Sequence, residues 1–317
     1  MSAPTSSTLD GPRLPTELIE QILELAWHSD TSREDRSRWL MALPLVNSTF
    51  LVICRRLFFR WVHVPCFSYA LNWLDIPRHN HPDDPDLIFS PPPDILRMMC
   101  QSITLYTSAQ LDRLSPGSGS GLISHTLYKL SHFDIAPNLT ELNFVYHDRM
   151  FADFFNSYHL FDLPPTVTSL SIRFEMTKVD RDAAKLLFAR RIPMRDVDAS
   201  RRRHTQVHTL EVLGTCAEFV RDVLHYCDGV KSLTYDGIEA LDSFGDARLQ
   251  KLILRPPTRR TLRLQDVPVM MVAEARVFKD AATEGSSPKL ILENMDVGEG
   301  VLQALRQARV GLEVVCL

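Results

Sequence analysis

The segment Val167-Thr168-Ser169-Leu170-Ser171-Ile172 has the pattern that decides the fold of this chain. Its first residue, Val167, is apolar, and the next two, Thr168 and Ser169, are polar. Two further apolar residues, Leu170 and Ile172, follow with the polar Ser171 between them. Because side chains alternate between the two faces of a β-strand, Leu170 and Ile172 would point into a core and the serines away from it. The segment therefore predicts a strand with one buried face.

The same pattern recurs along most of the chain. Clear copies occur at Cys100–Leu105, Leu139–Phe144, Val207–Val212, Val230–Tyr235 and Leu249–Leu254, with weaker ones at Lys289–Leu292 and Leu312–Val315. Helix-like stretches lie between several of them, at Asp180–Arg190, Ala217–Cys227, Val269–Asp280 and Gly300–Arg309. Strands that alternate with helices in this way predict an α/β fold. The outward positions include Thr140, Asn143, Ser169, Ser171, Thr209, Glu211, Ser232 and Thr234, whose mostly small polar side chains suit either a protein-binding surface or plain solvation.

The spacing of the copies decides between two α/β architectures. Successive starts lie 19 to 40 residues apart, whereas regular leucine-rich repeats run about 20–29 residues and carry an Asn or Cys ladder. Six recurrences of one pattern favour an irregular leucine-rich-repeat-like solenoid over residues 99–317. The alternative is a mixed α/β domain whose strands share a start pattern.

The first sixty residues have a different pattern. A Leu-Pro pair opens each of two short apolar segments, Leu14–Leu25 and Leu43–Phe50, and a third segment, Leu51–Val62, is apolar on most faces. The polar stretch from His28 to Arg38 predicts a loop. About fifty residues cannot bury so much Leu, Ile, Phe and Trp alone. Part of this surface is therefore expected to face a partner or the rest of the chain.

These segments resemble an F-box, the small helical module that begins with Leu-Pro and continues with a Leu-x-x-Val segment and a basic, apolar stretch. The matching residues are Leu14, Pro15, Leu18, Ile22, Leu25, Leu43, Val46, Asn47, Phe50, Arg55, Leu57, Phe58 and Trp61. Many proteins of this kind in mushroom-forming fungi carry irregular leucine-rich repeats after the F-box. The resemblance implies a non-catalytic substrate receptor that docks onto the Skp-type adaptor of an SCF (cullin–RING) ubiquitin ligase and holds an unknown target protein.

The resemblance and the apolar pattern together predict the adaptor-binding residues. They are Leu14, Pro15, Leu18, Ile22, Leu43, Val46 and Leu57, each with a core position as the alternative. For Leu25, Phe50 and Trp61 the core position is favoured. The implied organisation is a disordered tail at 1–12, an F-box at 13–64, a linker with a Pro-rich loop at 65–98 and the target-binding domain at 99–317.

Composition limits the other function classes. The chain has 39 acidic and 35 basic residues, a net charge of -4, which gives no electrostatic footprint for nucleic acid or an anionic membrane. Its six scattered cysteines contain no C-x-x-C pair and predict reduced, mostly buried thiols. No signal peptide and no membrane-spanning run is apparent. We therefore expect a cytoplasmic or nuclear protein that binds no membrane and needs no cofactor.

Two clusters contain residue types that could carry chemistry. The residues His79, Asn80, His81, Asp83 and Asp84 contain metal-ligating types, but a solvated Pro-rich turn explains them better. The cluster Arg201-Arg202-Arg203 could bind an acidic or phosphorylated target, with a solvated loop as the favoured interpretation. No phosphate loop or catalytic motif occurs. A protein-interaction scaffold without ligase assembly is thus the main alternative, and a hydrolase-like enzyme the weaker one.

Overall fold

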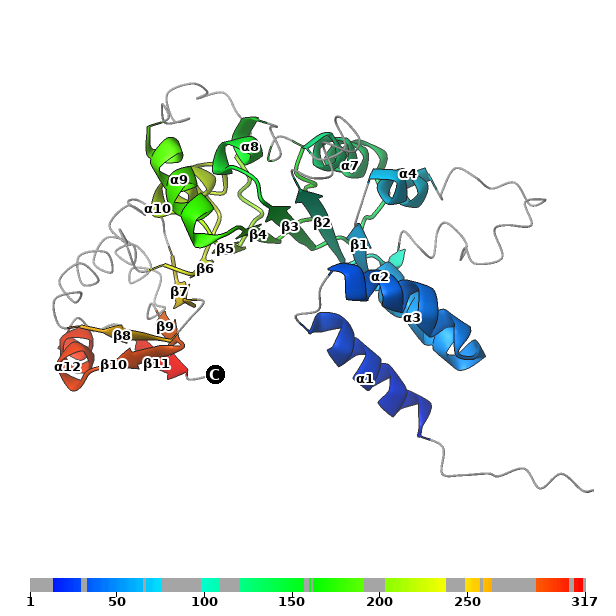
Figure 1. Ribbon diagram of the computed structural model, residues 1–317, viewed down its shortest axis with the longest axis horizontal. Coiled ribbons are helices and arrows are strands. Elements are labelled where there is room, and N and C mark those ends of the chain that lie inside the picture. Colours follow the sequence, from blue (N-terminus) through cyan, green and yellow to red (C-terminus); the bar gives the residue numbers. More distant parts are fainter. Residues whose placement is uncertain are drawn as a thin grey trace, which may run out of the picture. The chain divides into compact units, whose positions relative to one another are not determined.

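The computed structural model describes most of the chain (Figure 1). The described residues are 14–29, 33–64, 67–75, 98–108, 120–156, 160, 162–190, 203–237, 249–256, 259–263, 289–307 and 311–315. They divide into two compact units, Met1–Trp61 and Val62–Leu317. Predictions for the tail at 1–12, the Pro-rich loop at 77–94 and the helix at Val269–Asp280 lie outside the described residues.

The N-terminal unit consists of helices. They are α1 (Thr16–His28), α2 (Arg33–Ala42), the 3-10 turn η1 (Leu43–Leu45) and α3 (Ser48–Arg60). The carbonyl of Pro15 accepts the first helical hydrogen bonds, from Leu18 N at 3.1 Å and Ile19 N at 3.2 Å. The side chain of Asn47 accepts from Phe50 N at 2.9 Å and so caps α3. The start of α3 thus has a side-chain cap, whereas α1 begins without one.

A buried tryptophan joins the helices of this unit. Trp27, on α1, packs against the ring of Phe58 at 4.7 Å between centroids and donates from its indole N–H to the carbonyl of Trp61 at 3.3 Å. The guanidinium of Arg36, on α2, lies 5.6 Å from the Trp27 ring and donates to the carbonyls of Trp27 and Ser29. These bonds satisfy carbonyls that the end of α1 leaves free. They also explain why residues 33–38 belong to a helix although the stretch from His28 to Arg38 was predicted as a loop: a tertiary contact stabilises a polar segment.

The second unit is built on a parallel sheet. Its helices are α4 (Phe67–Asp75), α7 (Ser120–Phe133), α8 (Phe151–Asn156), α9 (Lys178–Ala189), α10 (Ala217–Tyr226) and α12 (Glu299–Gln307). Its strands are β1 (Trp61–Val64), β2 (Ser102–Ser108), β3 (Glu141–His147), β4 (Ser169–Glu175), β5 (Thr209–Leu213), β6 (Ser232–Tyr235), β7 (Lys251–Leu254), β8 (Arg260–Leu262), β9 (Lys289–Glu293), β10 (Met295–Val297) and β11 (Gly311–Val315). Nine strands form one sheet in the order β1-β2-β3-β4-β5-β6-β7-β9-β11, and the pairs from β2 to β11 are parallel. Helices α7 to α10 lie along one side of this row of strands (Figure 1).

The inward residues of the repeated pattern form the core. Leu170 and Ile172 pair in register with Leu210 and Val212 of the next strand, and all four are buried. Aromatic rings from the helices cover this face. Phe154 lies 6.1 Å from Tyr146, and the stacked pair of Tyr146 and Phe174 is 4.6 Å apart. The predicted strand alternation is therefore confirmed, as are helices at α9, α10 and α12.

The predicted architecture, an N-terminal helical F-box followed by an irregular leucine-rich-repeat-like solenoid, is wrong. Nine of the described strands form one continuous α/β sheet with helices on one face (Figure 1), and a closed N-terminal helical bundle is not evident. Only four described residues of that unit are fully buried, Trp27, Ile53, Cys54 and Leu57. In addition, β8 and β10 lie outside the main sheet and pair with each other. A solenoid would add one strand to the same sheet with each sequence repeat, and these two strands do not.

Two local features differ from the expected organisation. The stretch assigned to a linker includes α4, whose Ala70, Trp73 and Leu74 are buried in the second unit. The strands follow one another across the sheet in chain order. Across the strands that the structure describes, the order does not reverse, and such a reversal is where open α/β folds form a cofactor crevice.

Candidate functional site

Helix α1 has two apolar faces. Ile19 and Leu23 are half-buried and Trp27 is buried, so this face packs within the N-terminal unit. The other face is exposed and forms what we call the α1 stripe. The stripe consists of Leu14, Leu18, Ile22 and Leu25. Leu18, Ile22 and Leu25 are four and three residues apart and so lie along one side of α1, and Leu14 lies just before the helix begins.

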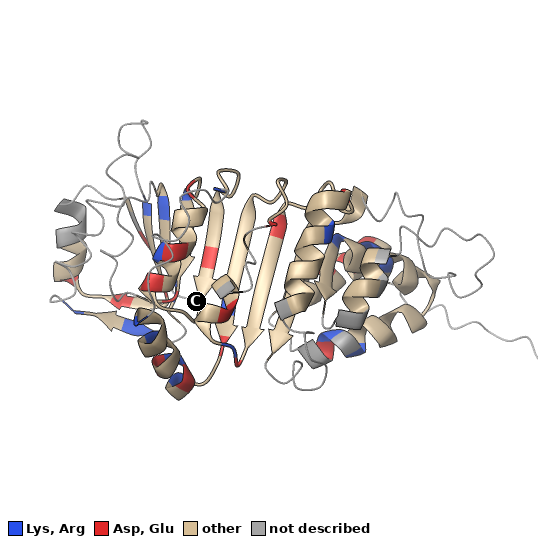
Figure 2. Ribbon diagram, turned by 90° about the horizontal axis from the view of Figure 1, so that it is seen from above, with Lys and Arg blue, Asp and Glu red and all other residues tan. Residues whose placement is uncertain are grey.

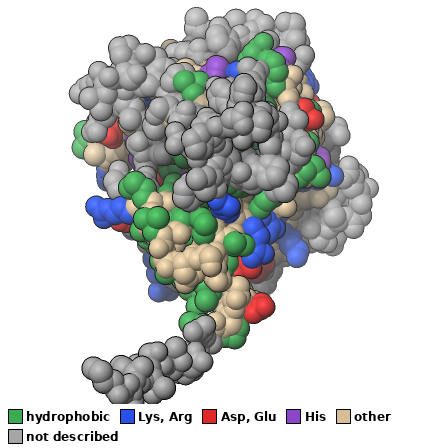
Figure 3. All heavy atoms as spheres, turned by 90° about the vertical axis from the view of Figure 1, so that its right-hand side faces the viewer, with side chains coloured by type: hydrophobic (Ala, Val, Ile, Leu, Met, Phe, Trp, Pro, Cys, Tyr) green, Lys and Arg blue, Asp and Glu red, His purple; other side chains and the backbone are tan. Residues whose placement is uncertain are grey.

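Exposed apolar residues continue into the turn after α2. Leu45 is 78 % exposed, and Met41, Val46 and, on α3, Val52 are also exposed. Figure 3 shows hydrophobic side chains reaching the surface beside basic ones in the lower half of that view. A salt bridge of 3.4 Å between Arg56 and Glu20 joins α3 to α1. The N-terminal unit therefore presents several large apolar side chains to solvent, which is typical of a binding surface.

The predicted adaptor-binding residues fall into three groups. Leu14, Pro15, Leu18, Ile22 and Val46 are exposed, and Leu43 is half-buried. Leu57 is only 4 % exposed and packs inside the N-terminal unit, so the structure places it in the interior rather than on a surface.

Leu25 was expected in the core and is instead 74 % exposed. Its spacing of three and seven residues from Ile22 and Leu18 could have placed it on the stripe. Phe50 and Trp61, also expected in the core, are half-buried.

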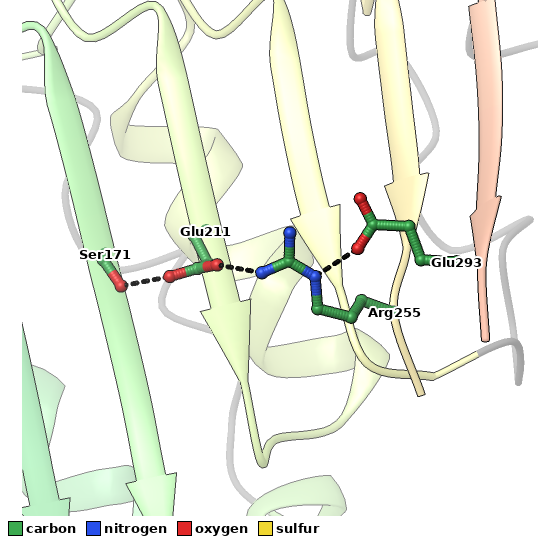
Figure 4. A network of polar contacts seen from close by, with 4 residues as sticks. All are labelled: Ser171, Glu211, Arg255 and Glu293. Atoms are coloured by element: carbon green, nitrogen blue, oxygen red, sulfur yellow. Dashed lines mark hydrogen bonds and ion pairs between the residues drawn. The ribbon is translucent and has the colours of Figure 1, made fainter. Parts of the chain in front are cut away.

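The sheet face that the helices leave uncovered carries a polar network (Figure 4). Ser171 on β4 donates to the Glu211 carboxylate on β5 at 2.8 Å. Arg255, just after β7, lies 3.4 Å from Glu211 and also binds Glu293 on β9. We call these four residues the polar ladder. It links four strands and fixes the orientation of two carboxylates and one guanidinium on the open face.

A second arrangement lies on the same face at the ends of β1 to β4. The His63 Nδ1 lies 2.9 Å from the Tyr106 hydroxyl, and the Tyr106 ring stacks on His147 at 6.3 Å. The His147 Nδ1 is 3.0 Å from the carboxylate of Glu175. The hydrogen bond from His147 lowers the pKa of Glu175. This histidine row orders ionisable side chains from four strands.

Sequence reasoning singled out Ser171 and Glu211 as outward-facing but missed the rest of the polar ladder and the histidine row. Arg255 and Glu293 follow the predicted strand patterns in the same outward phase, so alternation alone could have indicated them. Figure 2 shows that few charged residues lie along the central strands. The charged residues of the polar ladder are therefore exceptions on this sheet.

The remaining candidate residues are described only in part. Arg203 forms an exposed ion pair of 3.4 Å with Asp228, while Arg201 and Arg202 lie outside the described residues, as do His79, His81, Asp83 and Asp84. Within the ranges that the structure describes, no group of three or more His, Cys, Asp or Glu side chains could hold a metal ion.

The cysteines that can be described are free and buried. They are Cys54, Cys100, Cys216 and Cys227. Burial raises the pKa of Cys54 to about 11 and those of Cys100 and Cys227 to about 12. These thiols are therefore protonated near neutral pH and are poor nucleophiles.

Comparison with known proteins adds no assignment. No protein-family model matches the chain, and no curated protein shows significant sequence similarity to it. Across the described helices, none is both long enough and apolar enough to cross a membrane. The site features alone define the class: an α/β sheet protein with an exposed apolar helix face on a separate N-terminal unit.

Proposed function

We propose that this chain is a non-catalytic substrate-recognition subunit of an SCF (cullin–RING) ubiquitin ligase that acts in the cytoplasm or nucleus. The α1 stripe would dock the Skp-type adaptor, and the open sheet face would hold the target protein. One observation carries the proposal: α1 is apolar on two faces, and the N-terminal unit covers only one of them. The F-box-like sequence of the same helix makes a Skp-type adaptor the partner to test first.

Physical chemistry supports an adaptor on this surface. Exposed Leu and Ile side chains gain about 1.5–3 kcal/mol each when a partner buries them fully. Leu18, Ile22 and Leu25 lie within two turns of one helix, so one apolar groove could receive all three. The ion pair of Glu20 with Arg56 gives this surface a polar rim, as binding interfaces usually have.

The open sheet face suits target binding because its polar groups are held in fixed positions. Glu211 and Glu293 are oriented by Arg255, and Ser171 is oriented by Glu211. A partner that meets fixed donors and acceptors loses less side-chain entropy on binding. Arg203, the described member of the predicted arginine cluster, is paired with Asp228, so we place the target on the open face rather than at that cluster.

The test is a binding titration of the full chain with a purified Skp-type adaptor, followed by biolayer interferometry. Ile22→Glu should weaken binding by about 1–3 kcal/mol, which is about 5- to 150-fold in Kd. The Leu14→Ala and Pro15→Ala double variant should also weaken it. The matched control is Leu186→Glu, which places the same charge at an exposed leucine of the second unit and should leave adaptor affinity unchanged.

Two results would contradict the proposal. If the folded wild-type chain does not bind the adaptor, a protein-interaction scaffold without ligase assembly becomes the better interpretation. If Ile22→Glu and Leu186→Glu weaken binding equally, the adaptor does not recognise the α1 stripe. Circular dichroism of each variant shows whether lost binding reflects lost folding.

A further inference from the structure

Three lysines lie on neighbouring strands where β6, β7 and β9 begin. Lys251 and Lys289 are the first residues of β7 and β9, and they pair in register. Lys231 directly precedes β6; its carbonyl accepts from Lys251 N at 2.9 Å, and its own N–H donates to the carbonyl of His208 at 2.9 Å. Neighbouring strands are about 4.8 Å apart, so the three lysine backbones lie within about 10 Å of one another. We call these three residues the lysine edge.

The lysine edge belongs to the open sheet face. Lys251 has the same outward phase on β7 as Arg255, and Lys289 has the same phase on β9 as Glu293. Both Arg255 and Glu293 are members of the polar ladder. Lys231 and Lys289 are exposed, and Lys251 is half-buried. The edge therefore lies on the face that we assign to the target, and it is open to solvent.

The carboxylates near the lysine edge are engaged elsewhere or lie further along the strands. Within the part of the chain that the structure describes, none of the three lysines forms an ion pair. Asp228, in the turn before β6, pairs with Arg203, and the carboxylates of the polar ladder bind Arg255. Glu313 lies two residues beyond the register position of Lys289 on β11. The residues in register across β4 to β11 contain no carboxylate; they are Ser169, Thr209, Ser232, Lys251, Lys289 and Gly311.

The register of Lys251 and Lys289 does not favour the fold by itself. Like charges that lie directly opposite each other on neighbouring strands repel. Ser232 and Gly311 flank the pair in register, and neither has a side chain large enough to shield the two ammonium groups. A ligand with several negative charges would replace this repulsion by attraction. The arrangement therefore indicates an anionic partner.

We propose that the lysine edge binds an acidic segment of the target protein, in which several Asp or Glu side chains lie close together. Lysine ammonium groups on flexible four-carbon stems can follow such a segment across the three strands. The net charge of the whole chain is -4, which disfavours a long polyanion such as nucleic acid, whereas a short acidic segment meets the lysine edge alone. The inference rests on the proposed function only in calling this partner the target of ubiquitin transfer.

Fluorescence anisotropy of a labelled hexaglutamate peptide, titrated with the full chain, tests the proposal. The wild type should bind this peptide and not hexaglutamine, and binding should weaken as salt rises from about 0.05 to about 0.5 M. The double reversal Lys251→Glu and Lys289→Glu should raise the Kd at least about tenfold. The matched control, Lys178→Glu with Arg190→Glu, reverses two exposed charges at the ends of α9 and should leave the affinity nearly unchanged.

A second measurement needs no ligand. Lys289→Gln removes one of the two opposed charges, so its urea midpoint should equal or exceed that of the wild type. A clearly lower midpoint would show that the Lys289 charge already has a stabilising partner within the fold, and this would overturn the proposal.

Three outcomes of the peptide titration would also overturn it. They are no binding of hexaglutamate by the wild type, equal weakening by the two double variants, and tighter binding of a thymidine oligonucleotide of equal charge. Circular dichroism shows whether each variant is folded. The adaptor takes no part in these measurements, so their failure leaves docking through the α1 stripe standing. A failed adaptor titration likewise leaves the binding of an acidic peptide to be decided by its own result.

Discussion

The carboxylate of Asp236 accepts a hydrogen bond of 2.7 Å from the backbone N–H of Gly214, which has a φ of +76°. Gly214 follows β5, and Asp236 follows β6, so this bond joins the ends of neighbouring strands. Arg181 of α9 lies 3.9 Å from the same carboxylate. The backbone carbonyl of Phe174, on β4, would lie 2.0 Å from a Cβ at Gly214. Three strand ends and one helix therefore meet at a single glycine.

Replacing Gly214 by Ala should destabilise the second unit strongly. The new methyl group would collide with the Phe174 carbonyl, which belongs to a sheet strand and cannot move freely, and alanine also disfavours a positive φ. We expect a loss of about 3 kcal/mol or more in the free energy of unfolding. Urea denaturation followed by circular dichroism measures it.

The control for this substitution is Gly121→Ala. Gly121 lies in α7, and a Cβ there has no other atom within 4 Å. Alanine is the better helix former, so the free energy of unfolding should stay the same or rise by up to about 1 kcal/mol. Equal losses in the two variants would mean that the close approach at Gly214 does not limit stability.

Asp236 should make stability depend on pH in the direction opposite to that of most carboxylates. Burial raises its pKa, although the Gly214 N–H and Arg181 oppose the shift. Between its unfolded and folded pKa values the folded chain then binds more protons than the unfolded chain. The contribution of Asp236 is fully present below the unfolded pKa and is lost as pH rises through the raised folded pKa.

The comparison that reveals this effect is with Asp236→Asn. The amide resembles the protonated carboxyl and does not titrate. Urea midpoints of both proteins from about pH 3.5 to about pH 7, which span the usual carboxyl range, should show the wild type losing stability relative to the variant as pH rises. A difference that stays constant with pH would show that Asp236 has the same pKa in the folded and unfolded states.

The sequence predicted the individual strands well because strand alternation is a local property. Leu170 and Ile172 alternate with serines, and both are buried as expected. The assembly of the strands depends on pairings that no short segment contains. The pairing of Met295 with Arg260, which takes β8 and β10 out of the main sheet, has no counterpart in the repeated pattern. A repeat inferred from strand patterns alone therefore gave the wrong architecture.

The candidate sites show the same limit. Leu18 and Ile22 were predicted on a surface, and both are exposed, because the Leu-Pro start and the helical spacing are local features. Leu25 was expected in the core and is exposed, whereas Leu57 was expected on the surface and is buried. Which face of a helix the rest of the N-terminal unit covers is a tertiary property, and the local sequence does not contain it. Trp27 is the buried anchor of this unit, and its contacts with Phe58 and Trp61 join residues more than thirty positions apart.

The pair of His147 and Glu175 should stabilise the fold at neutral pH and not in acid. The hydrogen bond from His147 holds the pKa of Glu175 below its usual value. The stabilisation is present above the unfolded pKa of the carboxyl and is lost as pH falls through the lowered folded pKa. The Glu175 side chain is about half exposed, so solvent screening keeps the effect small, below about 1 kcal/mol.

Glu175→Gln tests this pair. The variant should be slightly less stable than the wild type at pH 7, and the difference should vanish near pH 3, as measured by urea midpoints. A difference that persists in acid would assign the effect to packing of the Glu175 side chain rather than to its charge.

The polar ladder should depend most on Arg255. Glu211 and Glu293 are both largely shielded from solvent, and Arg255 contacts both. Arg255→Met keeps a long apolar side chain but leaves these carboxylates without their shared cation. Because unpaired buried carboxylates are costly and Arg255 itself is partly exposed, we expect a loss of about 1–2 kcal/mol in the free energy of unfolding.

A double-mutant cycle with Glu293→Gln separates the ion pair from the packing of the arginine side chain. Once Glu293 is neutral, removing the arginine charge should cost less, so the two losses should add to more than the loss in the double variant. Arg259→Met is the control, since its ion pair with Asp296 is exposed and 4.0 Å long and should contribute little. Strictly additive losses would mean that Arg255 and Glu293 do not interact energetically. The close contact on the open face would then orient the carboxylate for a partner without stabilising the fold.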